Sequence, residues 1–203
     1  MKAIALAGMV LTAVLLAGCR SPEAAPQTAP RVAIRFKRIA IVEFYNRTPY
    51  TEPARQFTNA LQEKLAARVA STDVIVLPRS ALPTLGDPFV AGRFPLDALV
   101  SIRERFLADA VIIGSIDQHS PYWKPSVHFT LKVIDTATAQ FPCALTEEWD
   151  AATEKVRDEI DRYYASNYGS DDCRFGPDVF VTSPSRFLTF VADRTAQKLA
   201  AAL

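Results

Sequence analysis

The sequence predicts an α/β fold of the α+β kind, in which helices pack on a mixed β-sheet. In the first half, short β-branched runs alternate with helical patterns, which is typical of parallel strands joined by crossover helices. In the second half, apolar runs follow one another with only short turns between them, which indicates an antiparallel meander. Two further helical patterns end the chain, so the predicted element order is β-α-β-α-β-β-β-α-α.

The first half contains four of these elements, with a long loop before the fourth. Arg38–Phe44 is a nearly continuous β-branched and apolar run, as expected for a strand that is buried on both faces. Glu52–Ala70 places apolar side chains on one helical face, and Val74–Leu77 is a second strand. A proline- and glycine-rich loop over 78–95 then leads to a helix over Leu96–Leu107.

The next three segments predict the meander. Ala110–Ile116 is apolar throughout except at Ser115, and Val127–Val133 alternates apolar with polar residues, so that strand has one buried and one solvated face. A turn then leads to a fifth strand near Gln140–Trp149. We therefore expect three antiparallel strands beside the parallel pair.

The C-terminal part is predicted to be mostly helical. Asp150 is expected to cap a helix that ends near Asn167. Residues 168–182 have the composition of a loop, with a short strand at Val179–Val181. Ser183–Pro184 then has the preferred residues for the start of a final helix.

Composition and motifs argue against several function classes. The formal net charge is +1 over 203 residues, whereas a nucleic-acid partner needs a basic face. Neither a glycine-rich phosphate loop nor a Gly-x-Ser-x-Gly elbow is present. His119 and His128 could face each other across a hairpin, with Asp117 on the strand face of His119, but zinc needs three or four converging ligands. We predict no metal, no cofactor, no nucleic-acid partner and no enzymatic activity.

The N-terminal segment is predicted to be an export signal. The segment Leu15–Cys19 ends an apolar run and resembles the lipobox of bacterial lipoproteins, in which cleavage precedes the cysteine and that cysteine receives lipid. The resemblance implies a signal peptide over 1–18 and lipidation, including palmitate, at Cys19. The alternative is a short membrane-anchor helix without processing. A triacylated cysteine would hold the chain to a membrane almost permanently.

The predicted organisation beyond the signal is a tether and one globular domain. Residues 19–36 are rich in proline and alanine and form an extended tether, and 37–203 form the domain. Arg20, rather than Asp, follows the cysteine, which by resemblance to enteric lipoproteins implies the outer membrane, facing the periplasm. Cys143 and Cys173 could form a disulfide in that oxidising compartment, contributing roughly 3–4 kcal/mol, or could be two separate buried thiols.

Two stretches resemble a known family. Ile39–Phe44 with Asn46–Thr48, and Ala108–Ile116 with Leu131–Thr138, look like the periplasmic domain of curli-secretion lipoproteins (CsgG type) and of penicillin-binding protein activators (LpoB type). That domain is also similar to the N-terminal domain of TolB, and the first stretch resembles lipoproteins of lipopolysaccharide assembly (LptE type). The chain departs from the family pattern at Ala139, where glycine is usual.

Two pairs of residues are candidates for partner contact. Asn46 and Arg47 follow a central strand, at the edge where open α/β sheets often bind ligands, although turn formation is the alternative. Tyr122 and Trp123 lie between prolines at a predicted hairpin tip, where exposed aromatic residues favour protein contacts and local packing is the alternative.

These observations predict a membrane-anchored periplasmic lipoprotein that acts as a non-enzymatic protein-interaction or assembly factor of the cell envelope. Its partners would be the membrane, through lipid on Cys19, and another envelope protein, and it could form oligomers. The alternatives are an oligomeric outer-membrane secretion component like the curli channel, and an envelope protein that binds a small ligand with the 78–95 loop as a lid.

Overall fold

The structure, a computed structural model, describes residues 36–82, 87, 89, 94–168 and 176–203. These residues belong to the compact unit Ala33–Leu203. The predicted signal peptide, Cys19, most of the predicted tether and Cys173 lie outside the described residues.

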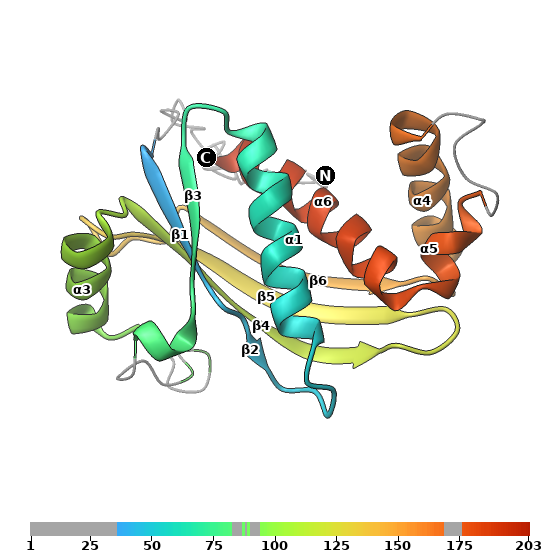
Figure 1. Ribbon diagram of the computed structural model, residues 1–203, viewed down its shortest axis with the longest axis horizontal. Coiled ribbons are helices and arrows are strands. Elements are labelled where there is room, and N and C mark those ends of the chain that lie inside the picture. The colour runs from blue at the N-terminus through green and yellow to red at the C-terminus, as the bar shows by residue number, and fades with distance from the viewer. Residues whose placement is uncertain (1–35, 83–86, 88, 90–93, 169–175) are drawn as a thin grey trace, which may run out of the picture. The chain divides into compact units, whose positions relative to one another are not determined.

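The described strands form one mixed sheet (Figure 1). They are β1 (Arg38–Val42), β2 (Tyr45–Asn46), β3 (Asp73–Leu77), β4 (Ala110–Ser120), β5 (Ser126–Asp135) and β6 (Cys143–Asp150). Their spatial order is β3-β1-β4-β5-β6, and β2 continues the line of β1 beside β4. The pairs β1–β3, β1–β4 and β2–β4 are parallel. Strands β4, β5 and β6 form the antiparallel meander that the sequence predicts.

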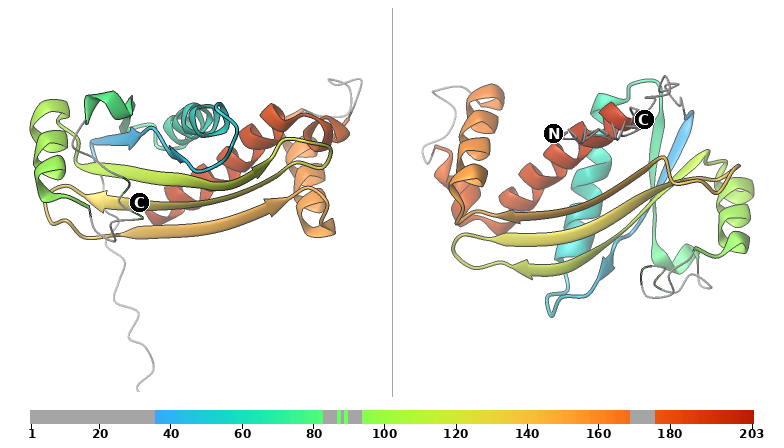
Figure 2. Two further views of the ribbon diagram at one scale, coloured as in Figure 1. Left: turned by 90° about the horizontal axis from the view of Figure 1, so that it is seen from below. Right: turned by 180° about the vertical axis from the view of Figure 1, so that it is seen from behind.

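Helices cover both faces of this sheet. They are α1 (Pro53–Arg68), α3 (Leu96–Phe106), α4 (Glu154–Asn167), α5 (Asp178–Thr182) and α6 (Pro184–Ala202), with a short 3₁₀ helix η1 (Arg79–Ala81) after β3. Helices α1 and α6 lie side by side on one face, and α3 packs on the other (Figures 1 and 2). Within the described residues, no helix has the length and apolar character that crossing a membrane requires.

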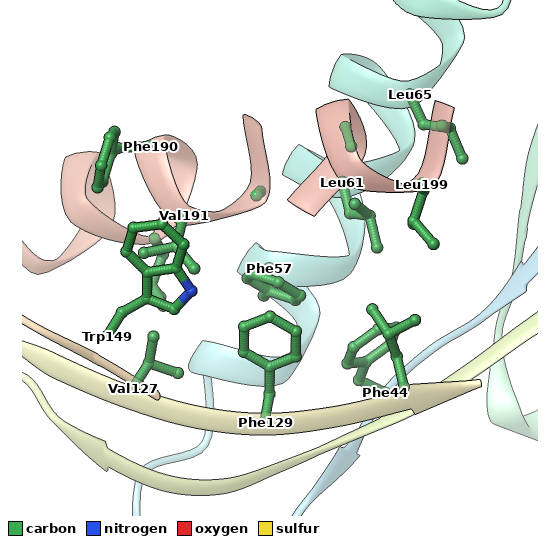
Figure 3. Packing of buried hydrophobic residues seen from close by; sticks show 14 of the residues in the cluster. Phe44, Phe57, Leu61, Leu65, Val127, Phe129, Trp149, Phe190, Val191 and Leu199 are labelled. Carbon is green, nitrogen blue, oxygen red and sulfur yellow. The ribbon is translucent and has the colours of Figure 1, made fainter. Parts of the chain in front are cut away.

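The larger core lies between the sheet and the α1–α6 pair (Figure 3). Phe57 and Leu61 of α1 are fully buried with Phe129 of β5, and Phe190 of α6 is fully buried against Trp149 of β6 (Figure 3). The rings of Phe57 and Phe129 lie 4.9 Å apart between centroids. The apolar stripe of the predicted first helix therefore faces the alternating residues of β5, as their periodicities require.

A smaller core lies under α3, and it covers only part of the second face. Leu99 and Ile102 of α3 are buried with Val42, Val111 and Ile113. Further along the meander, this face carries polar side chains, so helix cover ends where the apolar pattern ends. The polar residues are Ser115, Asp117, His128, Thr130, Lys132, Thr146 and Glu148.

The structure confirms the predicted element order and corrects three local predictions. Thr153, rather than Asp150, caps α4: its side chain accepts a hydrogen bond from the Val156 N–H at 3.4 Å. The turn predicted after the first strand contains β2. The strand predicted at Val179–Val181 is wrong, because these residues form α5. Phe180 is buried there against aromatic rings of α4 and α6, and this packing overrides the β propensity of the segment.

Candidate interaction surface at the β4–β5 hairpin

The hairpin between β4 and β5 presents two exposed aromatic side chains. Tyr122 is 70% exposed and Trp123 is 79% exposed, at the turn that joins Ser120 to Ser126. The two strands are long and paired over most of their length, so the turn is carried on a rigid ladder. The local-packing alternative for Trp123 does not describe its position, since most of its surface contacts solvent.

The turn is also fixed by contacts at its base. Lys124 adopts a left-handed backbone conformation, with φ of 57°, and its N–H donates to the Val181 carbonyl of α5 at 3.2 Å. The imidazole of His119 contacts the Ser126 carbonyl through Nδ1 at 2.9 Å. Burial lowers the pKa of His119, which favours the neutral ring. The aromatic tip is therefore presented in one defined geometry.

Tyr50, from the loop before α1, completes the aromatic surface. Its ring lies edge-on to His119 at 5.9 Å and to Tyr122 at 6.3 Å between centroids. A hydrogen bond with Tyr122 raises the pKa of the Tyr50 hydroxyl. A cavity of about 310 Å³ adjoins these rings, and Tyr50, His119, Pro53, Pro121 and Pro184 are among its lining residues. We call Tyr50, His119, Tyr122 and Trp123 the aromatic tip.

The other predicted pair, Asn46 and Arg47, is engaged in bonds within the domain. The Asn46 Oδ1 accepts from both the N–H and the hydroxyl of Thr48, at 3.0 and 2.8 Å, and its amide nitrogen donates to the Tyr50 carbonyl. Asn46 therefore builds the turn, as the alternative interpretation holds. Arg47 donates to Asp87 at 2.8 and 3.0 Å and to Asp117 at 2.9 Å. A recognition role for either residue would require breaking these bonds.

Asp117 lies in a β-bulge, which determines the hydrogen-bond partners of its carboxylate. The register shifts between Ile116 and Gln118, so Asp117 is the additional residue. Its carboxylate accepts from Ser115 at 2.8 Å and Thr130 at 3.2 Å, and lies 3.7 Å from His128 Nδ1. These residues and Arg47 form a polar cluster on the face of the sheet that α3 covers only in part.

The bulge also separates the two histidines. Gln118 pairs with His128 and His119 pairs with Val127, so the imidazoles lie on opposite faces of the hairpin. The prediction that they face each other, with Asp117 beside His119, is therefore wrong. Within the described residues, no three His, Cys, Asp or Glu side chains converge as metal ligands would.

A further cavity lies at the carboxyl end of β1. It has a volume of about 500 Å³, and its lining includes Glu43, Asn46, Arg55 and Arg79. The crossover through α1 leads to β3 on one side of β1, whereas the crossover through α3 leads to β4 on the other side. Ligands of open α/β sheets commonly bind at such a switch point.

The predicted disulfide involves only one described residue. Cys143 is half-buried at the start of β6, and Cys173 lies outside the described residues. The disulfide therefore stays a prediction, as does lipidation of Cys19.

Sequence reasoning placed Tyr122 and Trp123 at a hairpin tip, but it did not predict Tyr50 beside them or Asp87 beside Arg47. Prolines on either side of the aromatic pair gave a local signal. The partners of Tyr50 and Asp87 are far away in the chain, as in the 40-residue separation between Arg47 and Asp87. The sequence shows Asp87 only as an acidic residue in the long loop, and this gives no information about which residue it contacts.

No protein-family model and no curated protein sequence matches this chain, whereas solved structures do show a likeness. A variant PelC dodecamer from Paraburkholderia phytofirmans is 14% identical, with 82% of this chain and 87% of that chain covered and a TM-score of 0.48. Lipoprotein GNA1162 from Neisseria meningitidis is 12% identical, with 56% and 80% covered and a TM-score of 0.41. The LpoB C-terminal domain from Salmonella enterica is 14% identical, with 58% and 85% covered and a TM-score of 0.39.

These values assign the chain to no family. What the structure establishes is an α+β domain with an aromatic hairpin tip. The resemblance to the CsgG and LpoB types that the sequence indicates stays a prediction.

Proposed function

We propose that this protein is a lipid-anchored envelope protein that acts by binding another envelope protein through its aromatic tip, without catalysis. The observation that supports this most directly is the 79% exposure of Trp123 on an ordered hairpin. Large aromatic side chains supply much of the binding energy at protein interfaces, whereas an aromatic side chain exposed to water does not stabilise the isolated domain. The lipobox-like Leu15–Cys19 supports the anchor and the compartment.

The arrangement of the aromatic tip suits protein binding. Tyr122 and Trp123 offer apolar rings with hydroxyl and indole N–H donors, and the adjoining cavity offers a place for an incoming side chain. Because the turn is anchored to α5 and supported by Tyr50, little conformational entropy is lost when a partner binds.

The test is site-specific photo-crosslinking in native membranes. A photo-reactive phenylalanine analogue replaces Trp123 in one variant and Phe141 in a matched control, since Phe141 is 53% exposed on the turn between β5 and β6. We expect one discrete crosslinked partner from position 123 and none of that mass from position 141. Equal crosslinking from both positions would contradict the assignment of the surface.

The substitution Trp123→Ala separates binding from folding. We expect the free energy of unfolding to change by less than about 0.5 kcal/mol, because the side chain has few contacts to lose. Affinity for the crosslinked partner should fall at least about 30-fold, as at an interface hot spot. An unfolded variant, or full affinity, would refute the role proposed for Trp123.

A second candidate function is binding of a small ligand, which the cavity at the carboxyl end of β1 favours. Arg55 and Arg79 give its lining two positive charges and Glu43 gives one negative charge. A thermal-shift screen of small organic anions would test it: stabilisation that Arg79→Ala abolishes would support this function. Absence of any stabilisation would leave the aromatic tip as the candidate site.

A further inference from the structure

The end of the sheet that carries α3 exposes a patch of apolar side chains. Among the described residues, six large apolar side chains are exposed, and two of them belong to the aromatic tip. The other four lie on α3, at its carboxyl end and on the turn between β5 and β6, and we call them the α3 patch: Leu96, Val100, Leu107 and Phe141. Figures 1 and 2 show α3 and this turn at one end of the sheet and the β4–β5 turn at the other.

The α3 residues of the patch form one outward stripe. Val100 is four residues after Leu96 and seven before Leu107, which is about one and about two helical turns. These three side chains are 51–69% exposed, whereas Leu99 and Ile102 pack into the smaller core. Leu107 ends the helix with φ of 53°, in the left-handed region that glycine and asparagine adopt most readily. Neither packing within the domain nor backbone preference accounts for leucine at this position.

The described chain begins beside this patch. The Asp109 carboxylate accepts hydrogen bonds from the main-chain N–H groups of Lys37 at 2.8 Å and Arg38 at 3.1 Å. The Arg38 guanidinium also donates to the Phe106 carbonyl of α3 at 3.1 Å. The start of β1 is therefore fixed to the carboxyl end of α3, where the stripe ends.

The length of chain before the domain limits where a bilayer lies. The predicted lipid site, Cys19, is 17 residues before Phe36, so the extended tether spans about 50 Å at about 3.1 Å per residue. β4 has 11 residues and carries the aromatic tip about 35 Å further from this end of the sheet, at about 3.3 Å per residue. A bilayer that holds Cys19 therefore has a higher effective concentration at the α3 patch than at the aromatic tip.

The charges around the patch favour no particular head group. Arg103 and Arg105 are exposed on α3, and Asp97 and Glu104 are exposed on the same helix. These four charges cancel, so a contact at this surface depends on the apolar side chains and not on anionic lipid. Zwitterionic phospholipids also present one charge of each sign, and arginine side chains reach phosphate groups while their stems lie along apolar surface.

We propose that the α3 patch contacts the surface of the bilayer that holds the lipid anchor, with its apolar side chains between the phospholipid head groups. This inference rests on the anchor in the proposed function. The apolar side chains gain a burial there that the isolated domain does not give them. Because the aromatic tip lies at the opposite end of the sheet, the same contact directs the tip away from the bilayer, toward a protein partner.

The test uses the chain as a bacterial host lipidates it, reconstituted into phosphatidylcholine vesicles that contain a nitroxide-labelled lipid as quencher. A fluorescent amino acid replaces Arg103, which lies between Val100 and Leu107. In two control chains it replaces the exposed Asn59 of α1 or Tyr122. We expect quenching at position 103 to be at least about fivefold stronger than at positions 59 and 122, because only the α3 patch enters the head-group layer.

The outcomes separate this inference from the anchor. Vesicle flotation reports the anchor, and a chain that does not float would overturn the anchor and this inference with it. A chain that floats with equal quenching at the three positions, or with the strongest quenching at position 122, would overturn this inference alone. Quenching at position 103 that appears only when each vesicle holds many chains would assign the patch to a second copy of the protein, and would also overturn it.

Two substitutions test the patch itself. The double variant Leu96→Gln with Leu107→Asn removes apolar surface at exposed positions, and asparagine tolerates the left-handed backbone, so the domain should stay folded. We expect this variant to float like the wild type, while quenching at position 103 falls to the level at position 59. The matched control Trp123→Gln removes an exposed apolar side chain at the opposite end and should leave quenching at position 103 unchanged. Undiminished quenching in the double variant, with its fold verified by circular dichroism, would overturn the proposal.

Discussion

Gly114 of β4 supports the ring of Phe44, and this contact predicts a large effect for one added methyl group. A Cβ atom at Gly114 would lie 2.2, 2.4 and 2.6 Å from three atoms of the Phe44 ring. The ring cannot retreat easily: it is 1% exposed, it packs against Phe57 at 5.4 Å, and the Phe44 N–H is bonded to Thr58 Oγ1 at 3.0 Å. Overpacking of a core costs about 1–3 kcal/mol, and these distances place Gly114→Ala near the upper end.

The assay is urea unfolding followed by circular dichroism, with a double-mutant cycle. We expect Gly114→Ala to lower the free energy of unfolding by about 3 kcal/mol and the melting temperature by about 6–12 °C. Phe44→Leu should relieve the clash, so the double variant should be at least about 1 kcal/mol more stable than the sum of the two single effects. Strict additivity, or a Gly114→Ala variant within about 0.5 kcal/mol of the wild type, would refute the packing described here.

Three further predictions concern other buried groups. The side chain of Asp193 is 8% exposed and accepts a hydrogen bond from Arg68 at 2.9 Å. In urea unfolding, Asp193→Ala should lower the free energy of unfolding by about 2–3 kcal/mol. The control Arg55→Ala removes an exposed ion pair and should lower it by less than about 0.5 kcal/mol. Burial lowers the pKa of His119 in the folded state. As the pH drops below about 6.5, the unfolded state therefore binds a proton at this residue before the folded state does, and the free energy of unfolding falls. The unfolding midpoint of His119→Asn should accordingly change less between pH 7.5 and pH 5.5 than that of the wild type. The buried Nε1 of Trp149 has no hydrogen-bond partner among the described residues. Trp149→Phe should therefore change the free energy of unfolding by no more than about 1 kcal/mol, because removal of an unsatisfied donor offsets the lost volume. A loss above about 3 kcal/mol would show that this nitrogen does form a hydrogen bond.

Much of the fold could be predicted because its local patterns agree with its tertiary arrangement. The β-branched run at Arg38–Phe44 is buried on both sides of the sheet, and Val127–Val133 alternates because one of its faces has no helix cover. Proline and serine at 183–184 begin α6 where expected. In these segments, periodicity and capping chemistry report burial directly.

The remaining features depend on contacts between distant segments. The bulge at Asp117 has no local sequence signature, and it decides which side chains meet Arg47 and His128. The α5 segment has strand-like residues, but burial of Phe180 among aromatic rings makes it helical. The aromatic tip was half predicted, because Tyr122 and Trp123 are local whereas Tyr50 joins them from a loop more than 70 residues earlier.

The central claim is that this domain works from a lipid anchor in the envelope. The most direct measurement is incorporation of radiolabelled palmitate into the full chain and into Cys19→Ser in a bacterial host, followed by membrane fractionation. We predict that the wild-type chain is labelled and sediments with membranes, and that the variant is unlabelled. An unlabelled wild-type chain recovered in the cytosolic fraction would contradict the claim.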